Sequence, residues 1–144
     1  MMRNSKPILL VEDDSVDAMT VQRALSELEV PNKLVRKADG KEALEYLGAL
    51  SNEKPCIILL DLNMPKMNGF EFLKILKADD SLKKIPVVVL TTSADKADTV
   101  ESFELGVAGY VVKPIDYKEF IEKIRVINLY WTLSELPNGD QNGG

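Results

Sequence analysis

Four short apolar runs along this chain each end beside a side chain that carries a charge or a hydroxyl group. The runs cover residues 8–11, 57–60, 87–90 and 110–112. The residues that follow them are, in the same order, Glu12 with Asp13, then Asp61, Thr91 and Lys113. Short continuous apolar runs bounded by polar breaks are typical of strands buried on both faces of a parallel sheet.

The segments between these runs carry apolar residues three or four positions apart, which is the spacing of a helix with one buried face. Five helices are predicted, near residues 15–28, 40–50, 69–76, 95–105 and 117–133. A fifth strand at 33–37 is more polar than the others, so it is expected near an edge of the sheet. This alternation predicts an α/β fold with a doubly wound parallel sheet of five strands and five helices.

Parallel strands place their carboxyl ends on one edge of the sheet, so the polar residues that follow the runs are expected to meet there. Neighbouring carboxylates resist joint ionisation unless a cation relieves their repulsion, and Mg²⁺ prefers such oxygen ligands. Asp61 is then a candidate nucleophile toward a phosphoryl group, with Lys113 and Thr91 stabilising the phosphoryl oxygens. Each residue alone would be an ordinary cap or turn residue; their joint position at strand ends favours a site.

The composition and length of the chain exclude several kinds of protein and partner. The 144 residues suggest a single domain, and the net charge of −5 argues against partners such as nucleic acid or anionic membranes. The absence of histidine excludes Ser-His and Cys-His catalysis, and the single Cys56 fits a reducing compartment. No apolar run is long enough for a membrane span, and no signal peptide is visible, so a cytoplasmic location is expected. Residues 1–6 are expected to be flexible, 7–133 to form the domain, and 134–144 to be a disordered tail.

Four segments, in this order and at this spacing, resemble the receiver domain of the two-component response regulators, the CheY-like family. The segments are Val11–Asp14, Leu60–Gly69, Leu90–Ser93 and Gly109–Pro114. The resemblance extends from about Lys6 to Ile127 and implies a flavodoxin-like sheet with strand order 2-1-3-4-5.

The resemblance also implies a phosphoacceptor and a metal site. Asp61 would accept the phosphoryl group. Asp13 and Asp61 would bind Mg²⁺ directly, Glu12 would act through water, and the backbone carbonyl of Asn63 would complete the site.

Three further residues receive roles from the resemblance. Lys113 would pair with the phosphoryl group, and the Lys113–Pro114 peptide bond would be cis, directing the lysine inward. Thr91 would be the switch hydroxyl and Tyr110 the switch aromatic. When Thr91 moves toward the phosphoryl group, Tyr110 would turn inward, and the face formed by segments 95–105, 109–112 and 117–133 would change shape.

The chain is accordingly expected to be a stand-alone response regulator in a phosphorelay, with weak intrinsic autophosphorylation and autodephosphorylation, rather than an enzyme. The donor would be a sensor histidine kinase or a histidine phosphotransfer protein. The long last helix with Tyr130 and Trp131, together with the connector 51–55, is similar to receivers paired with bacterial phytochrome kinases.

The last predicted helix is more apolar than one packed face requires. Val126, Leu129, Tyr130 and Leu133 extend the apolar surface beyond the expected core positions. Such a stripe favours an interface, either for a homodimer or for a partner protein, and a tail folded back over it is the alternative.

Two other functions remain open from the sequence. An Mg²⁺-dependent phosphatase with an aspartyl nucleophile would need an acid two residues after Asp61, where this chain has Asn63. A receiver-like adaptor that is never phosphorylated would have no use for the acid pair and Lys113.

Overall fold

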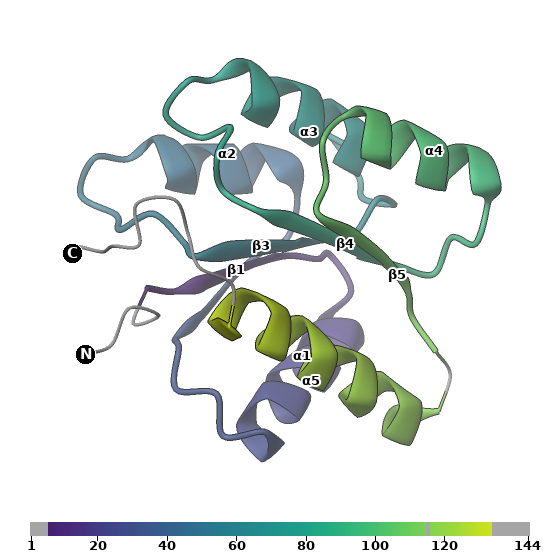
Figure 1. Ribbon diagram of the computed structural model, residues 1–144. Helices are drawn as coiled ribbons and strands as arrows, with labels where there is room; N and C mark the ends of the chain where they lie inside the picture. The colour runs from purple at the N-terminus through teal and green to yellow at the C-terminus, as the bar shows by residue number, and fades with distance from the viewer. Residues whose placement is uncertain (1–5, 115, 134–144) are drawn as a thin grey trace.

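Five strands and five helices alternate along the chain, as predicted (Figure 1). The computed structural model describes residues 6–114 and 116–133, with side chains through Leu129. The elements are β1 (Ile8–Val11), α1 (Ser15–Glu27), β2 (Leu34–Lys37), α2 (Gly40–Gly48), β3 (Ile57–Leu60), α3 (Gly69–Ala78), β4 (Val87–Thr91), α4 (Lys96–Glu104), β5 (Gly109–Val112) and α5 (Tyr117–Leu133).

All five strands are parallel and lie in the order β2-β1-β3-β4-β5, so the predicted fold class and strand order are confirmed. The interior strand β1 pairs Val11 with Lys37 of β2 on one side and with Leu60 of β3 on the other. The polar strand β2 lies at an edge, as its composition predicted. This register brings the ends of β1 and β3 level, which places the residues that follow them next to each other.

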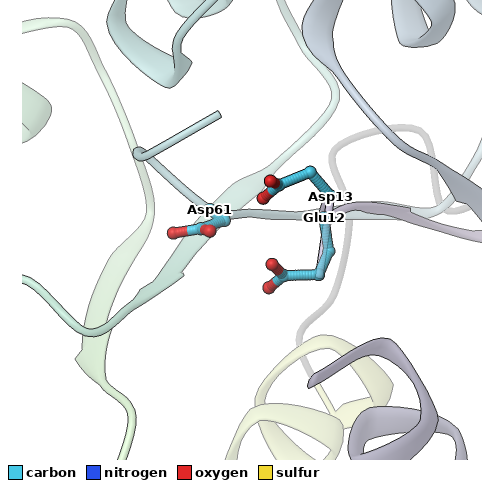
Figure 2. A group of neighbouring side chains, drawn as sticks. All are labelled: Glu12, Asp13 and Asp61. Carbon is cyan, nitrogen blue, oxygen red and sulfur yellow. The ribbon is translucent and has the colours of Figure 1, made fainter. Parts of the chain in front are cut away.

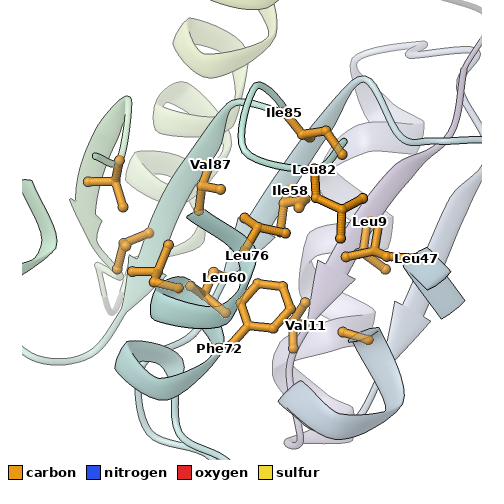
Figure 3. Packing of buried hydrophobic residues seen from close by; sticks show 14 of the residues in the cluster. Leu9, Val11, Leu47, Ile58, Leu60, Phe72, Leu76, Leu82, Ile85 and Val87 are labelled. Carbon is orange, nitrogen blue, oxygen red and sulfur yellow. The ribbon is translucent and has the colours of Figure 1, made fainter. Parts of the chain in front are cut away.

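Helices cover both faces of the sheet, with α1 and α5 on one face and α2, α3 and α4 on the other (Figure 1). Alternate strand residues face the two layers: Leu9 and Ile58 pack toward α3, whereas Leu10 and Leu59 pack toward α1 and α5. Figure 3 shows the first of these clusters, in which the ring of Phe72 lies among the strand side chains. Because every residue of β1 and β3 is buried, these strands read as uninterrupted apolar runs.

Four helices begin at a short polar side chain that accepts a hydrogen bond from the first turn. The N-caps are Asp14, Asp39, Asn68 and Asp95 for α1 to α4, respectively. At α3 the bond is reciprocal, because Glu71 also accepts from the backbone N–H of Asn68. These caps end the loops at the carboxyl edge of the sheet and so limit how far each loop can move.

Replacing Gly69 with alanine is expected to destabilise the fold at the loop that follows Asp61. A Cβ atom at Gly69 would lie 2.7 Å from the Cα atom of Leu62 and 2.9 Å from the backbone oxygen of Asp61. Backbone atoms yield little, so we expect a loss of about 1–3 kcal/mol in the free energy of unfolding, measured by urea titration. Gly48→Ala is the matched control: its Cβ would meet nothing within 4 Å, and alanine should stabilise α2 by about 0.5–1 kcal/mol. Equal stability of the two variants would contradict this account.

The last helix has one buried face and one exposed face. Phe120, Ile124 and Ile127 are buried against the sheet and α1, while Val126 is 57% exposed and Leu129 is 40% exposed. The side chains of Tyr130 and Leu133, two more residues of the predicted interface, lie outside the described residues. So do residues 1–5 of the predicted flexible start (1–6) and the whole predicted disordered tail (134–144). Within the described part of the chain, no helix has both the length and the apolar character needed to cross a bilayer.

Candidate functional site

Three carboxylates meet at the carboxyl edge of the sheet, where β1 and β3 end side by side (Figure 2). One oxygen from each of Glu12, Asp13 and Asp61 lies within 4.8 Å of the others. Glu12 and Asp61 are buried and Asp13 is exposed, so the cluster opens to solvent on one side only. The backbone joins the two strand ends, since the N–H of Asp61 donates to the carbonyl of Val11 at 3.0 Å.

An arginine from the neighbouring strand holds the acidic loop in place. The Arg36 guanidinium on β2 donates to the carbonyl of Glu12 at 2.9 Å and to that of Asp13 at 3.0 Å. Sequence reasoning missed this residue, because its role depends on β2 lying beside β1. The available signal was a basic residue in the predicted strand that precedes the second helix.

Lys113 reaches the cluster from the end of β5. Its Nζ atom lies 2.6 Å from Oε1 of Glu12 and 2.8 Å from Oδ2 of Asp17, and its side chain is only 9% exposed. The expectation of a cis bond before Pro114 is wrong, because no peptide bond among the described residues is cis. The trans form is the intrinsically favoured isomer of a peptide bond before proline. With this bond in the trans form, the side chain of Lys113 already extends into the site.

Asp17 is a further acid that sequence reasoning did not assign to the site. It lies in the first turn of α1, and its partner Lys113 is 96 positions away along the chain. The only feature of the sequence that could have indicated this role was an acidic residue one helical turn after Glu12 and Asp13. Such a residue is not specific, because acidic residues are common in the first turn of any helix.

Burial and crowding alter the protonation of the site. Burial raises the pKa of Glu12 to about 7, and the charge of Asp61 adds to this, although the ion pair with Lys113 opposes it. For Lys113, burial acts to lower the pKa, but hydrogen bonds to Asp17 and Glu12 outweigh it and raise the pKa above its usual value. The site therefore holds a charged lysine among acids that repel one another, and a cation would relieve that repulsion.

The remaining predicted residues are Asn63, which follows β3, Thr91, which ends β4, and Tyr110, which lies within β5. The backbone N–H of Asn63 donates to Oδ1 of Asp61 at 3.4 Å. Thr91 is fully buried, and its hydroxyl accepts from the N–H of Ser93 at 3.3 Å. The half-buried Tyr110 donates its hydroxyl to the carbonyl of the same Ser93 at 2.9 Å. Thr91 and Tyr110 thus both bond to Ser93, in the segment between β4 and α4.

Comparison with protein families finds one matching model, described as the response regulator receiver domain, over residues 8–125. Among characterised proteins, response regulator Rcp1 of a Synechocystis strain is 40% identical over 130 residues, which are 88% of this chain and 88% of that protein.

Two solved structures agree with this match. The phosphorylated cyanobacterial phytochrome response regulator RcpA superposes with a TM-score of 0.85 at 39% identity, over 92% of this chain and 98% of that one. The Mn²⁺-bound form of Rcp1 superposes with a TM-score of 0.80 at 38% identity, over 88% of this chain and 94% of that one.

Proposed function

This chain belongs to the response regulator receiver domain family, and on that premise we propose that it is a stand-alone response regulator whose phosphoacceptor is Asp61. Members of the family are signalling modules of two-component systems rather than classical enzymes, and they typically take phosphate from histidine kinases. One observation carries the proposal: Asp61 lies with Glu12 and Asp13 in a single cluster that also holds the nearly buried Lys113.

The residues of the cluster fit Mg²⁺. The carboxylates of Glu12, Asp13 and Asp61 offer only oxygen atoms, which Mg²⁺ prefers as ligands. The backbone carbonyl of Asn63 would complete the site. The cluster meets solvent at exposed Asp13, where water can reach a bound ion. When bound, the ion would neutralise charge on the transferring phosphoryl oxygens.

The transfer step uses the carboxylate of Asp61 as the nucleophile. An oxygen of Asp61 forms a bond to phosphorus, while the phosphorus–nitrogen bond of the donor phosphohistidine breaks and its electron pair stays on the imidazole nitrogen. The ammonium group of Lys113 neutralises one phosphoryl oxygen. The hydroxyl of Thr91 turns from Ser93 to donate to another.

Movement of Thr91 would carry the signal to the surface. Tyr110 and Thr91 both bond to Ser93, so a shift of Thr91 changes the contacts of β5 and the start of α4. The surface over α4, β5 and α5 exposes apolar side chains suited to a partner or to a second copy of the chain, including the predicted Val126 and Leu129. The exposed members on the other two elements are Val100, Phe103 and Val112.

The donor kinase is proposed to be of the phytochrome type and the location cytoplasmic. The support for the kinase is that RcpA, which is 39% identical, is a phytochrome response regulator. A phosphorylated histidine phosphotransfer protein would serve the same chemistry.

The test of this function is the intact mass of the protein after incubation with Mg²⁺ and phosphoramidate. The expected result is a mass gain of one phosphoryl group that requires Mg²⁺. The protein should not release free phosphate with rapid turnover. Continuous hydrolysis of phosphomonoesters would instead indicate the phosphatase. Absence of any adduct, also with a phosphorylated histidine kinase as the donor, would indicate the constitutive adaptor.

The affinity for Mg²⁺ is expected to rise about tenfold between about pH 6 and about pH 8. Because the pKa of Glu12 is raised to about 7, its proton competes with the cation below pH 7, and the carboxylate is free above it. Calorimetric titrations at the two pH values measure the change, and Glu12→Gln should remove most of it. The same affinity at both pH values in the unsubstituted protein would contradict the expectation.

A further inference from the structure

Lys113 is held between two carboxylates that differ in their surroundings. Its Nζ atom is 2.6 Å from Glu12, whose side chain is 2% exposed, and 2.8 Å from Asp17, whose side chain is 39% exposed. Glu12 belongs to the acidic cluster with Asp13 and Asp61, so its contact with the lysine follows from the position of the site. The contact with Asp17 comes from outside that cluster.

Asp17 is not needed to begin its helix. Asp14 is the N-cap of α1, and its side chain accepts from the backbone N–H groups of Val16 and Asp17 at 2.8 and 3.0 Å. The side chain of Asp17 instead turns toward the end of β5 and occupies one of the three N–H donors of Lys113. A second donor is taken by Glu12, which leaves one for any group on Asp61.

We infer that Asp17 is a positioning residue that competes with the incoming phosphoryl group for Lys113. The inference rests on the function proposed above. A phosphoryl group on Asp61 carries more negative charge than a carboxylate and attracts the ammonium group more strongly. The contact with Asp17 is the one that gives way, because solvent can take the place of the lysine at a partly exposed carboxylate but not at buried Glu12.

The competition affects the two phosphoryl reactions differently. Before phosphorylation, Lys113 is bound to Asp17, and in the transition state it is bound to the phosphoryl group, so loss of Asp17 accelerates phosphorylation. In the phosphorylated protein Lys113 already binds the phosphoryl group, and it stays bound as water attacks, so loss of Asp17 leaves dephosphorylation nearly unchanged. A purely structural role of Asp17 would not separate the two rates in this way.

The test measures both rates for Asp17→Asn with phosphoramidate and Mg²⁺, by intact mass over time. In this reaction an oxygen of Asp61 bonds to phosphorus, and the phosphorus–nitrogen bond breaks as ammonia leaves. The rate constant for phosphorylation is expected to increase about two- to fivefold, as suits a partly exposed ion pair, while the half-life of the phosphorylated protein after donor removal changes by less than about 1.5-fold. Asp17→Glu, which keeps a carboxylate within reach of Lys113, should restore the rate of the unsubstituted protein.

Two controls separate the contact from general charge. Glu45→Gln removes one negative charge from an exposed position on α2 and should leave both rates unchanged. In the background of Lys113→Met, which is expected to be phosphorylated slowly, adding Asp17→Asn should have no further effect, because the partner is already absent.

The outcomes also distinguish failure of the proposed function from failure of the role inferred for Asp17. If the unsubstituted protein gains no phosphoryl group, the proposed function fails, and this inference fails with it. If that protein is phosphorylated but Asp17→Asn reacts no faster, or if the acceleration persists in the Lys113→Met background, the function stands and the role of Asp17 is wrong.

Discussion

Asp61→Asn is expected to abolish the mass gain that phosphoramidate and Mg²⁺ produce in the unsubstituted protein. The asparagine amide has nearly the shape of the carboxylate but is not a nucleophile toward phosphorus. Asp61 is buried beside Glu12 and Asp13, so the substitution also removes one charge from a crowded cluster. In the absence of Mg²⁺, the stability of the variant should therefore be equal to or higher than that of the unsubstituted protein.

Measuring thermal unfolding alongside the mass separates loss of chemistry from loss of fold. Asp95→Asn is the matched control: it is the same substitution at an exposed N-cap of α4, where asparagine caps as well as aspartate. This control should gain one phosphoryl group as the unsubstituted protein does. A phosphoryl adduct on Asp61→Asn would show that another residue is the acceptor and would overturn the assignment.

Phe72→Ala is expected to cause the largest loss of stability, about 3–5 kcal/mol in the free energy of unfolding. The ring is completely buried between α3 and the sheet, among residues of β1, β3 and β4 (Figure 3). Its removal leaves a cavity that the surrounding strands cannot close without disturbing the ends that carry the site. Since small domains are stable by about 5–15 kcal/mol, this loss is a large share of the total stability of the fold.

Urea titration followed by circular dichroism measures this loss. Phe103→Ala removes the same ring from α4, where the side chain is 49% exposed, and should cost less than about 1 kcal/mol. A similar loss for both variants would mean that Phe72 does not organise the core as its burial indicates.

Tyr110 and Thr91 illustrate how much of the site could be predicted. Each lies in a strand whose apolar pattern was visible in the sequence. The rule that parallel strands end at one edge was enough to expect Thr91 near Asp61, whereas the switch roles of Thr91 and Tyr110 came only from the resemblance. The prediction of a cis bond before Pro114 was wrong. Whether the bond is cis or trans depends on the packing around the end of β5 and on the position of Lys113 relative to the site. The residues next to Pro114 in the sequence determine neither of these.

The sequence by itself determined the strands, the helices, the order of layers and the meeting of Glu12, Asp13 and Asp61. It did so because strands that are buried on both faces give continuous apolar runs, and helices with one buried face give apolar residues three or four positions apart. Both patterns can be seen in the sequence, and parallel pairing then brings the strand ends together. Only the tertiary structure decided that Arg36 holds the acidic loop and that Asp17 binds Lys113 across 96 positions of chain. These contacts depend on how β2 lies beside β1 and how the start of α1 lies beside the end of β5, and the distance between such elements leaves no repeating pattern along the chain.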